Sequence, residues 1–264
     1  MRSALCDCAL PERRGAWYQG PKGSKAMNLK VLCVKWGTKF PAEYVNKLFH
    51  MVRRNLTLPH RFLCLTDDPA GLEPGIGTAE LHPGFEYCWN KLELFRPGVF
   101  TGDDLLLYFD LDVVITGNID DLAAFRPQDT FVGLRDWYGF WNPHYNSSVM
   151  RFHGDRHSDL YVRLAAELAD GRARWGREYD EYLGSNDKVV LWEGGRRYAG
   201  DQDWISRHVY SSRELRRHGF PGPWIRSYRK HARRGLPRGC KVVVFHGSPK
   251  PHEVGTDYVR EHWR

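Results

Sequence analysis

The sequence has no long hydrophobic run. No apolar segment approaches the ~18–20 residues that a membrane-spanning helix needs. Residues 1–26 are rich in glycine, proline and charge, and they contain no apolar stretch of the kind found in a secretory signal. We therefore expect a cytoplasmic protein with a disordered tail over residues 1–26 and a single domain over residues 27–264.

Paired cysteine spacings and internal repeats are also absent. The six cysteines are scattered, which argues against a zinc site or a disulfide framework and favours reduced thiols, four of them in apolar surroundings. The 264 residues are 42% hydrophobic and 14% aromatic, enough for a sizeable core. The composition therefore predicts a globular domain.

Apolar runs and helical spacing alternate along the first half of the chain. We expect a helix from Pro41 to about Asn55, a short helix over 89–95 and a longer helix over 159–169. The expected strands cover residues 29–36, 61–66, 105–115, 131–134, 148–152 and 241–245. This alternation predicts an α/β fold with a largely parallel central sheet flanked by helices.

Two carboxylates interrupt the most apolar of these strands. Asp110 and Asp112 follow the run Leu105–Phe109, and on an extended backbone both side chains point to the same side. A dication with oxygen ligands, Mg²⁺ or Mn²⁺, would relieve their repulsion and act as a Lewis acid on a leaving diphosphate. The alternative is that the pair caps a turn or faces solvent, as most D-x-D sequences do.

Later polar residues offer further candidates, each with a structural alternative. Lys250, between two prolines, suits phosphate binding on a stiff backbone, or it is a surface lysine in a turn. His246 is a metal ligand or a half-buried histidine at a strand end. Asp201 is either a residue of the reaction site or the start of a helix, and Asn146 is either a site residue or a turn residue.

The order of these motifs resembles a known family. Asp110-Leu111-Asp112, Asn146–Met150, Gly200–Asp203 and His246–Pro251 occur in the order seen in the GT-A glycosyltransferases of family 8. That family includes glycogenin and the bacterial lipopolysaccharide galactosyl- and glucosyltransferases. The resemblance covers residues 29–252, and Trp89–Leu92 is similar to the short helix that carries a donor-binding lysine.

The resemblance implies a Rossmann-like GT-A fold and a retaining, metal-dependent glycosyltransferase. It implies Mn²⁺ or Mg²⁺, a nucleoside-diphosphate sugar donor with UDP-sugar favoured, and a glycan or other hydroxyl acceptor. The residues that match are Asp110, Asp112 and His246 for the metal, Lys91, Gly247 and Lys250 for the donor, and Asn146, Asp201 and Gln202 for the transferred sugar.

The chain departs from the family pattern at two positions. The family's metal-binding histidine usually lies three residues before the glycine, where this chain has Val244, whereas His246 is adjacent to Gly247. Either the loop differs, or His246 is not the ligand. Ser148 also occupies a position where the family often has glycine.

Two other segments suggest partners. Residues 213–241 hold ten of the basic residues and a single acidic one, a composition that suits an anionic membrane surface or an acidic acceptor, or simply a solvated loop. Peripheral attachment to the inner membrane face is therefore one expectation, and nucleic acid is not an expected partner. The aromatic loop 136–145 is either an acceptor platform or core.

Two alternative functions remain from the sequence. The D-x-D after an apolar strand also fits, superficially, the nucleophile motif of haloacid-dehalogenase-type phosphatases, although that motif normally follows the first strand. The basic segment by itself would suit a non-catalytic binder of acidic polymers.

Overall fold

The computed structural model describes residues 28–137, 145–180, 185–212, 215 and 218–264. Its centre is a six-stranded mixed sheet of order β3-β2-β1-β4-β7-β6. The first four strands run parallel, and β7 is antiparallel to both of its neighbours. The strands are β1 Asn28–Lys35, β2 His60–Thr66, β3 Gly77–Glu80, β4 Asp104–Phe109, β6 Phe131–Arg135 and β7 Tyr145–His153. The α/β class is confirmed, with a mixed sheet.

Alternate residues of the central strands feed two separate cores. In β4, Leu105, Leu107 and Phe109 pack into one core, while Leu106 and Tyr108 pack into the other. This period of two is what a strand covered on both faces requires. Burial on both faces explains why β4 is apolar from Leu105 to Phe109, with the buried Asp104 at its start.

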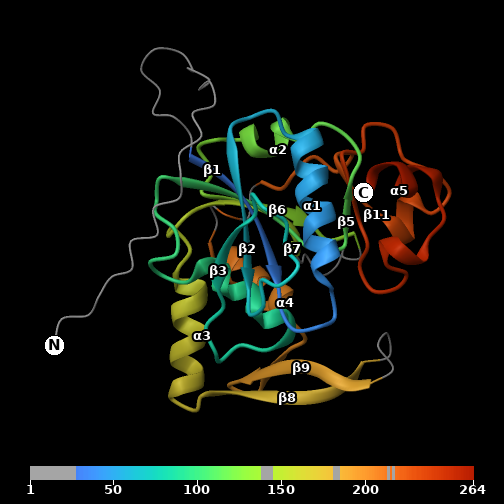
Figure 1. Ribbon diagram of the computed structural model, residues 1–264. Helices are drawn as coiled ribbons and strands as arrows, with labels where there is room; N and C mark the ends of the chain where they lie inside the picture. The colour runs from blue at the N-terminus through green and yellow to red at the C-terminus, as the bar shows by residue number, and fades with distance from the viewer. Residues whose placement is uncertain (1–27, 138–144, 181–184, 213–214, 216–217) are drawn as a thin grey trace.

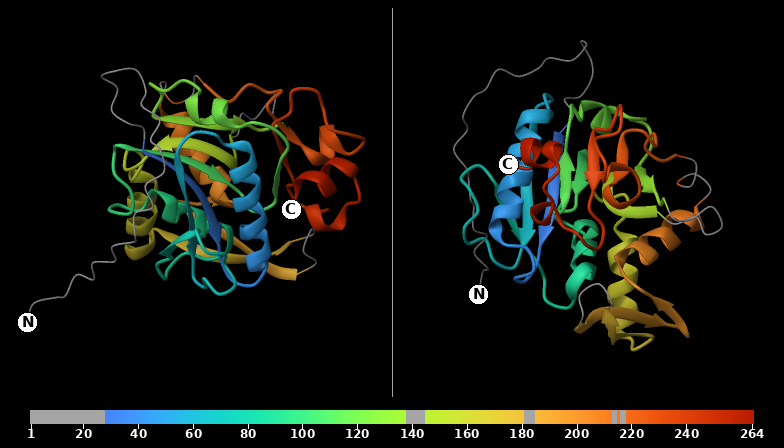
Figure 2. Two further views of the ribbon diagram at one scale, coloured as in Figure 1. Left: turned by 45° about the horizontal axis from the view of Figure 1, so that its top comes forward. Right: turned by 90° about the vertical axis from the view of Figure 1, so that its right-hand side faces the viewer.

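The first core lies beneath α1 and the C-terminal segment, which Figures 1 and 2 show on the same side of the sheet. A small three-stranded sheet, β11-β12-β5, completes this layer. Its elements are α1 Ala42–Asn55, β5 Val113–Ile115, α2 Asp120–Ala124, β11 Ile225–Ser227, the π-helix η3 Tyr228–Ala232, β12 Val242–Val244, the 3₁₀ helix η4 Pro251–Glu253 and α5 Asp257–His262.

The second core lies beneath two α-helices and a 3₁₀ helix. A three-stranded antiparallel sheet, β10-β9-β8, closes this side, and its strands β8 and β9 lie to the right of the lower end of α3 in Figure 1. The elements are η1 Tyr87–Phe95, α3 Asp159–Ala169, β8 Ala173–Asp180, β9 Ser185–Glu193, β10 Arg196–Tyr198 and α4 Asp201–Ser211.

The strand expected over 105–115 is wrong as a single element. The chain leaves β4 at Asp110, turns through Leu111 and Asp112, and enters β5, which pairs with β12 in the other sheet. The two carboxylates therefore lie at a junction between two sheets rather than on one extended strand. Asp110 still follows directly after the carboxyl end of β4, as expected.

Most other expected elements are present, and several short ones were missed. α3 has the predicted bounds, and α1 begins directly after Pro41. The sequence patterns did not indicate α2, β3, β8, β9, β10, β11, α5 or the short helices η3 and η4, most of which are short or carry many charged residues.

Cys33, Cys64, Cys88 and Cys240 are free thiols, as expected, whereas Cys6 and Cys8 belong to the N-terminal segment outside the described residues. Within the described ranges, every helix is too short or too polar to cross a bilayer.

The turn before β4 is closely packed against Gly154. A Cβ atom on Gly154 would lie 1.7 Å from the carbonyl oxygen of Thr101, which itself accepts the N–H of Asp104. We predict that Gly154→Ala lowers the free energy of unfolding by ~1–3 kcal/mol, because this backbone must move. The measurement is a urea titration at constant m-value.

Gly222→Ala is the matched control, since nothing lies within 4 Å of its Cβ position. It should change stability by less than about 0.5 kcal/mol. Equal stability of the two variants would show that the turn is not held as described.

Candidate functional site

One cavity of about 310 Å³ opens at the carboxyl ends of β1 and β4. In open α/β sheets ligands bind at such an edge. The described part of the chain brings together every residue singled out from the sequence, because all of them line this cavity: Lys91, Asp110, Asp112, Asn146, Asp201, Gln202, His246, Gly247 and Lys250. They come from η1, the β4–β5 junction, β7, α4 and the loop after β12.

Lys91 is the centre of the polar network in this cavity. Its ammonium nitrogen lies 2.8 Å from Oδ1 of Asp110 and 3.1 Å from Oδ2 of Asp201. It also donates to Oγ of Ser147 at 2.9 Å, and that hydroxyl donates to Asp201 at 2.6 Å. Lys91 is only 8% exposed, so one buried cation holds two carboxylates from different elements in place.

A second lysine pairs with the second carboxylate of the D-x-D sequence. The Lys250 ammonium contacts Oδ2 of Asp112 at 2.5 Å, and Asp112 is 8% exposed. The backbone N–H of Lys250 donates to the Glu253 carboxylate, which fixes this residue at the start of η4. Each aspartate of the pair therefore has its own ammonium partner.

The two aspartates differ in acidity. Burial alone would raise the pKa of Asp110, but the charge of Lys91 and hydrogen bonds from Lys91, Tyr108 and Ser148 hold it below its usual value. Burial raises the pKa of Asp112 above its usual value; Lys250 opposes this shift and the nearby charge of Asp110 adds to it. Asp110 is therefore the more firmly ionised of the two.

His246 lies in the same cavity but within another set of contacts. Its Nε2 is 2.6 Å from Oγ of Ser227, and its ring stacks on Trp137 at a centroid distance of 5.6 Å. Burial lowers the pKa of His246 to about 4, with Arg229 adding to the shift, so the ring is neutral at pH 7. Among the described residues, the only group of three His, Cys, Asp or Glu side chains whose possible metal-ligand atoms lie within 4.8 Å of one another is elsewhere, around His208. The role of His246 as a metal ligand stays a prediction.

The remaining candidates have clear local roles. Asn146 is the second residue of strand β7 and not a turn residue, so the structural alternative expected for it is wrong. Its side-chain oxygen accepts the backbone N–H of Ser148 at 3.0 Å. Gly200 precedes α4 as its N-cap, so Asp201 and Gln202 form the first turn of the helix. Gly247 has a φ of +68°, a conformation that favours glycine and turns the chain past the cavity.

Two residues of the network were not among the candidates from the sequence. Tyr108 donates its hydroxyl proton to Asp110 at 2.6 Å, and Ser147 links Lys91 to Asp201. Tyr108 lies two residues before Asp110, so a period of two along β4 was a usable signal. Nothing in the local sequence separates Ser147 from Ser148.

An aromatic group lines another part of the cavity and was also missed. Trp36 and Tyr87 meet edge to face with ring centroids 6.4 Å apart, and Phe40 lies next to Lys250. Lys39 donates to the Tyr87 hydroxyl at 2.9 Å. Tyr87 has a φ of +55°, an uncommon conformation for a residue other than glycine. The cavity therefore combines charged and aromatic walls.

The structure describes only part of the two segments for which the sequence predicted partners. In the aromatic loop, residues 138–144 lie outside the described ranges; Trp137 packs on His246, and Tyr145 is buried in β7. In the basic segment 213–241, residues 213–214 and 216–217 lie outside these ranges. Lys241 pairs with Asp121 at 2.7 Å, and Arg233, Arg234 and Arg238 are exposed.

Comparisons with known proteins do not assign this chain to a family. A scan against models of protein families finds no match to this chain, and a search of curated proteins finds no significant relative. We therefore infer function from the cavity and its residues.

The network around Lys91 makes a stability prediction. Lys91→Met leaves the carboxylates of Asp110 and Asp201 without their shared counter-charge, and we expect a loss of ~3–5 kcal/mol in the free energy of unfolding. Denaturant titration measures the loss.

Adding Asp201→Asn to Lys91→Met should restore part of the stability, because one uncompensated charge is removed. Lys39→Met, at an exposed lysine of the same cavity, serves as the control and should cost less than about 1 kcal/mol. Equal losses in Lys91→Met and Lys39→Met would contradict the central role of Lys91.

Proposed function

We propose that this protein is a metal-dependent glycosyltransferase of the GT-A type. In this proposal it transfers a sugar from a nucleoside-diphosphate donor, with UDP-sugar favoured, to a glycan or another hydroxyl acceptor. The observation that carries the proposal is the convergence of the Asp110–Asp112 pair, two lysines and an aromatic wall in one cavity at the carboxyl edge of the sheet.

The charges of the cavity suit a bound diphosphate only when the carboxylates are neutralised. Asp110, Asp112 and Asp201 bring three negative charges to the lining, and Lys91, Lys250 and the exposed Lys39 bring three positive ones, so the lining has no net positive charge of its own. A divalent ion at the carboxylates would give the cavity the positive charge that attracts a diphosphate. This charge balance supports the expected requirement for a divalent ion.

The residues present fit Mn²⁺ or Mg²⁺ through their donor chemistry. Asp110 and Asp112 offer carboxylate oxygens, which these ions prefer, and the neutral ring of His246 lies in the same cavity. When bound, the ion supplies Lewis-acid stabilisation of the departing diphosphate. Asp110 and Asp112 are the residues that we expect to hold it.

The other side chains position the donor. Lys250, on the stiff segment between two prolines, is the cation best placed to exchange its carboxylate partner for a phosphate oxygen. Lys91 and Ser147 fix the carboxylate of Asp201 at the start of α4, so its orientation in the cavity is set before substrate arrives. Gln202 follows in the same helical turn and lines the same space.

The aromatic wall suits the nucleoside. Trp36, Phe40 and Tyr87 offer faces and edges on which a base stacks, and base stacking on such rings contributes ~1–3 kcal/mol. Aromatic and charged residues line the same cavity, as a base joined to a diphosphate requires. Retention of anomeric configuration and the choice of acceptor rest on the family resemblance.

Release of UDP from the donor tests the catalytic proposal. We expect Asp110→Asn and Asp112→Asn each to lower the turnover of UDP-sugar by roughly 10²–10³-fold, because several kcal/mol of transition-state stabilisation depend on the bound ion. The measurement is UDP released with Mn²⁺ present, after chelation, and after Mn²⁺ is restored.

Asp121→Asn is the matched control, since Asp121 pairs with Lys241 away from the cavity. It should leave turnover unchanged. Full activity in the presence of EDTA would contradict the metal role. Phosphate released from sugar phosphates, without UDP release, would instead favour the phosphatase alternative.

The exposed arginines of the basic segment support a separate prediction about partners. If the protein attaches to an anionic membrane, replacing Arg233, Arg234 and Arg238 by glutamine should weaken pelleting with phosphatidylserine vesicles by about 1 kcal/mol per charge. Raising the salt should weaken it as well. Absence of pelleting at low salt would exclude this partner.

A further inference from the structure

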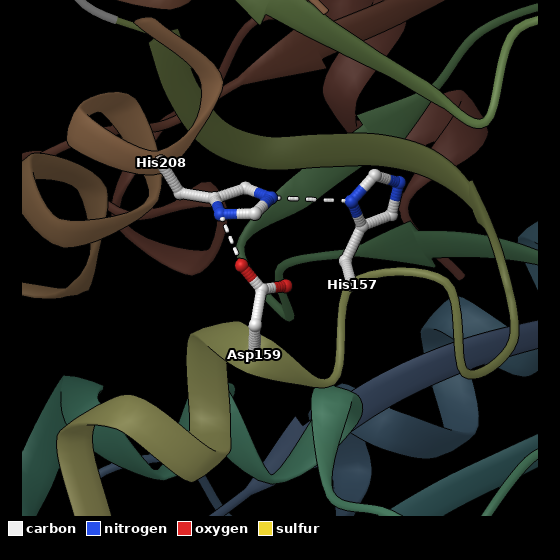
Figure 3. A group of neighbouring side chains, drawn as sticks. All are labelled: His157, Asp159 and His208. Atoms are coloured by element: carbon white, nitrogen blue, oxygen red, sulfur yellow. Dashed lines mark hydrogen bonds and ion pairs between the residues drawn. The ribbon is translucent and has the colours of Figure 1, made fainter. Parts of the chain in front are cut away.

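A cluster of three ionisable side chains lies apart from the cavity. His157 is in the turn before α3, Asp159 is the first residue of α3, and His208 belongs to α4 (Figure 3). None of the three lines the cavity described above. Their donor atoms all lie within 4.8 Å of one another.

The two imidazole rings face each other. Nδ1 of His157 is 3.2 Å from Nε2 of His208, and the outer nitrogen of each ring has an oxygen partner. Nε2 of His157 is 3.1 Å from the carbonyl oxygen of Thr130, and Nδ1 of His208 is 3.0 Å from Oδ2 of Asp159. Figure 3 shows the second carboxylate oxygen of Asp159 on the side toward His157.

Two neutral rings cannot satisfy all of these contacts. An additional positive charge between the inner nitrogens is needed. A carbonyl and a carboxylate only accept, so each ring must place its single proton on its outer nitrogen. The inner nitrogens then present two lone pairs to each other at 3.2 Å, an arrangement that is repulsive when nothing lies between them. Moving a proton inward leaves an outer nitrogen facing an oxygen lone pair instead.

We propose that His157, Asp159 and His208 form a second metal site, which takes a nitrogen-preferring ion of the Zn²⁺ class. The inner ring nitrogens are the ligands, Asp159 orients His208 and approaches the ion, and water completes the coordination. This site differs in chemistry from the Asp110–Asp112 pair, because imidazole favours Zn²⁺ over Mg²⁺ or Mn²⁺.

The dimensions and surroundings agree with this assignment. Two nitrogens 3.2 Å apart, each 2.0–2.1 Å from Zn²⁺, subtend an angle of about 100° at the ion, close to tetrahedral. A small cavity of about 110 Å³ lies beside Asp159 and His208. Arg163 and Arg207 line it, but both are paired with Glu193.

The proposed ion would join α3 to α4 near the cavity. His208 lies about two helical turns after Asp201 and Gln202, which begin the same helix. A metal ligand at His208 therefore limits the movement of α4 relative to α3. Its role is structural, since none of its ligands reaches the cavity.

Titration with Co²⁺ tests the site by absorbance, without any need for activity. The full chain carries Cys6→Ser, Cys8→Ser and Asp110→Asn, so that neither the N-terminal cysteines nor the carboxylate pair binds the ion. We expect one equivalent of Co²⁺ with the visible absorption of a tetrahedral centre. His157→Gln and His208→Gln should abolish it, and Asp159→Asn should weaken binding by roughly 10–100-fold.

His50→Gln, a surface histidine paired with Glu73, is the control and should bind as the parent does. A second measurement uses the chain that carries only Cys6→Ser, Cys8→Ser and Asp110→Asn. Saturating Zn²⁺ should raise its melting temperature, and EDTA should reverse the shift. Absence of both signals, or unchanged Co²⁺ absorption in His208→Gln, would overturn the proposal, and the two rings would then share a proton. These results do not depend on glycosyl transfer.

Discussion

The contact between Lys91 and its two carboxylates is the interaction on which the cavity depends. It joins η1, the end of β4 and the start of α4, and Ser147 of β7 closes the network. A buried cation with two carboxylate partners costs desolvation energy, which only a fixed and fully satisfied geometry offsets. The need to satisfy these groups fixes the relative positions of four segments that are distant in the sequence.

The break between β4 and β5 places the carboxylates in this network. Continuous extended backbone would have placed Asp110 and Asp112 along one strand of one sheet. Instead, Asp110 remains with β4 and the Lys91 network, while Asp112 turns toward Lys250 beside the second sheet. The two acids therefore differ in environment, and their pKa values are shifted in opposite directions.

The two candidate metal sites use different donors. The cavity offers carboxylate oxygens, and the cluster around His208 offers imidazole nitrogens. The helix α4 connects them, with Asp201 at its start and His208 near its end. If both proposals hold, a structural ion at one end of α4 helps to keep the reacting side chains in place at the other.

The cavity shows how much of the candidate site could be predicted from local sequence patterns. The candidate residues were found from an apolar run that ends in two carboxylates and from the order of motifs in the family resemblance. Asp110 lies at the edge where the parallel strands end, as expected. The other candidates reach the same cavity from η1, β7, α4 and the loop after β12, which the sequence does not place relative to one another. The bounds of α3 were equally accessible, because its buried leucines, Leu160 and Leu164, repeat at helical spacing.

The sequence by itself determined the α/β class, the helices α1 and α3 and the carboxylate pair, because each depends on spacing within a few turns or on the end of a single strand. The other candidate residues were named from the order of motifs in the family resemblance. Only the tertiary structure decided the turn at Leu111 and Asp112, the partners of Lys91 and the facing rings of His157 and His208. Those two histidines are 51 residues apart. Contacts at such separation depend on how whole elements pack, and no local pattern records that packing.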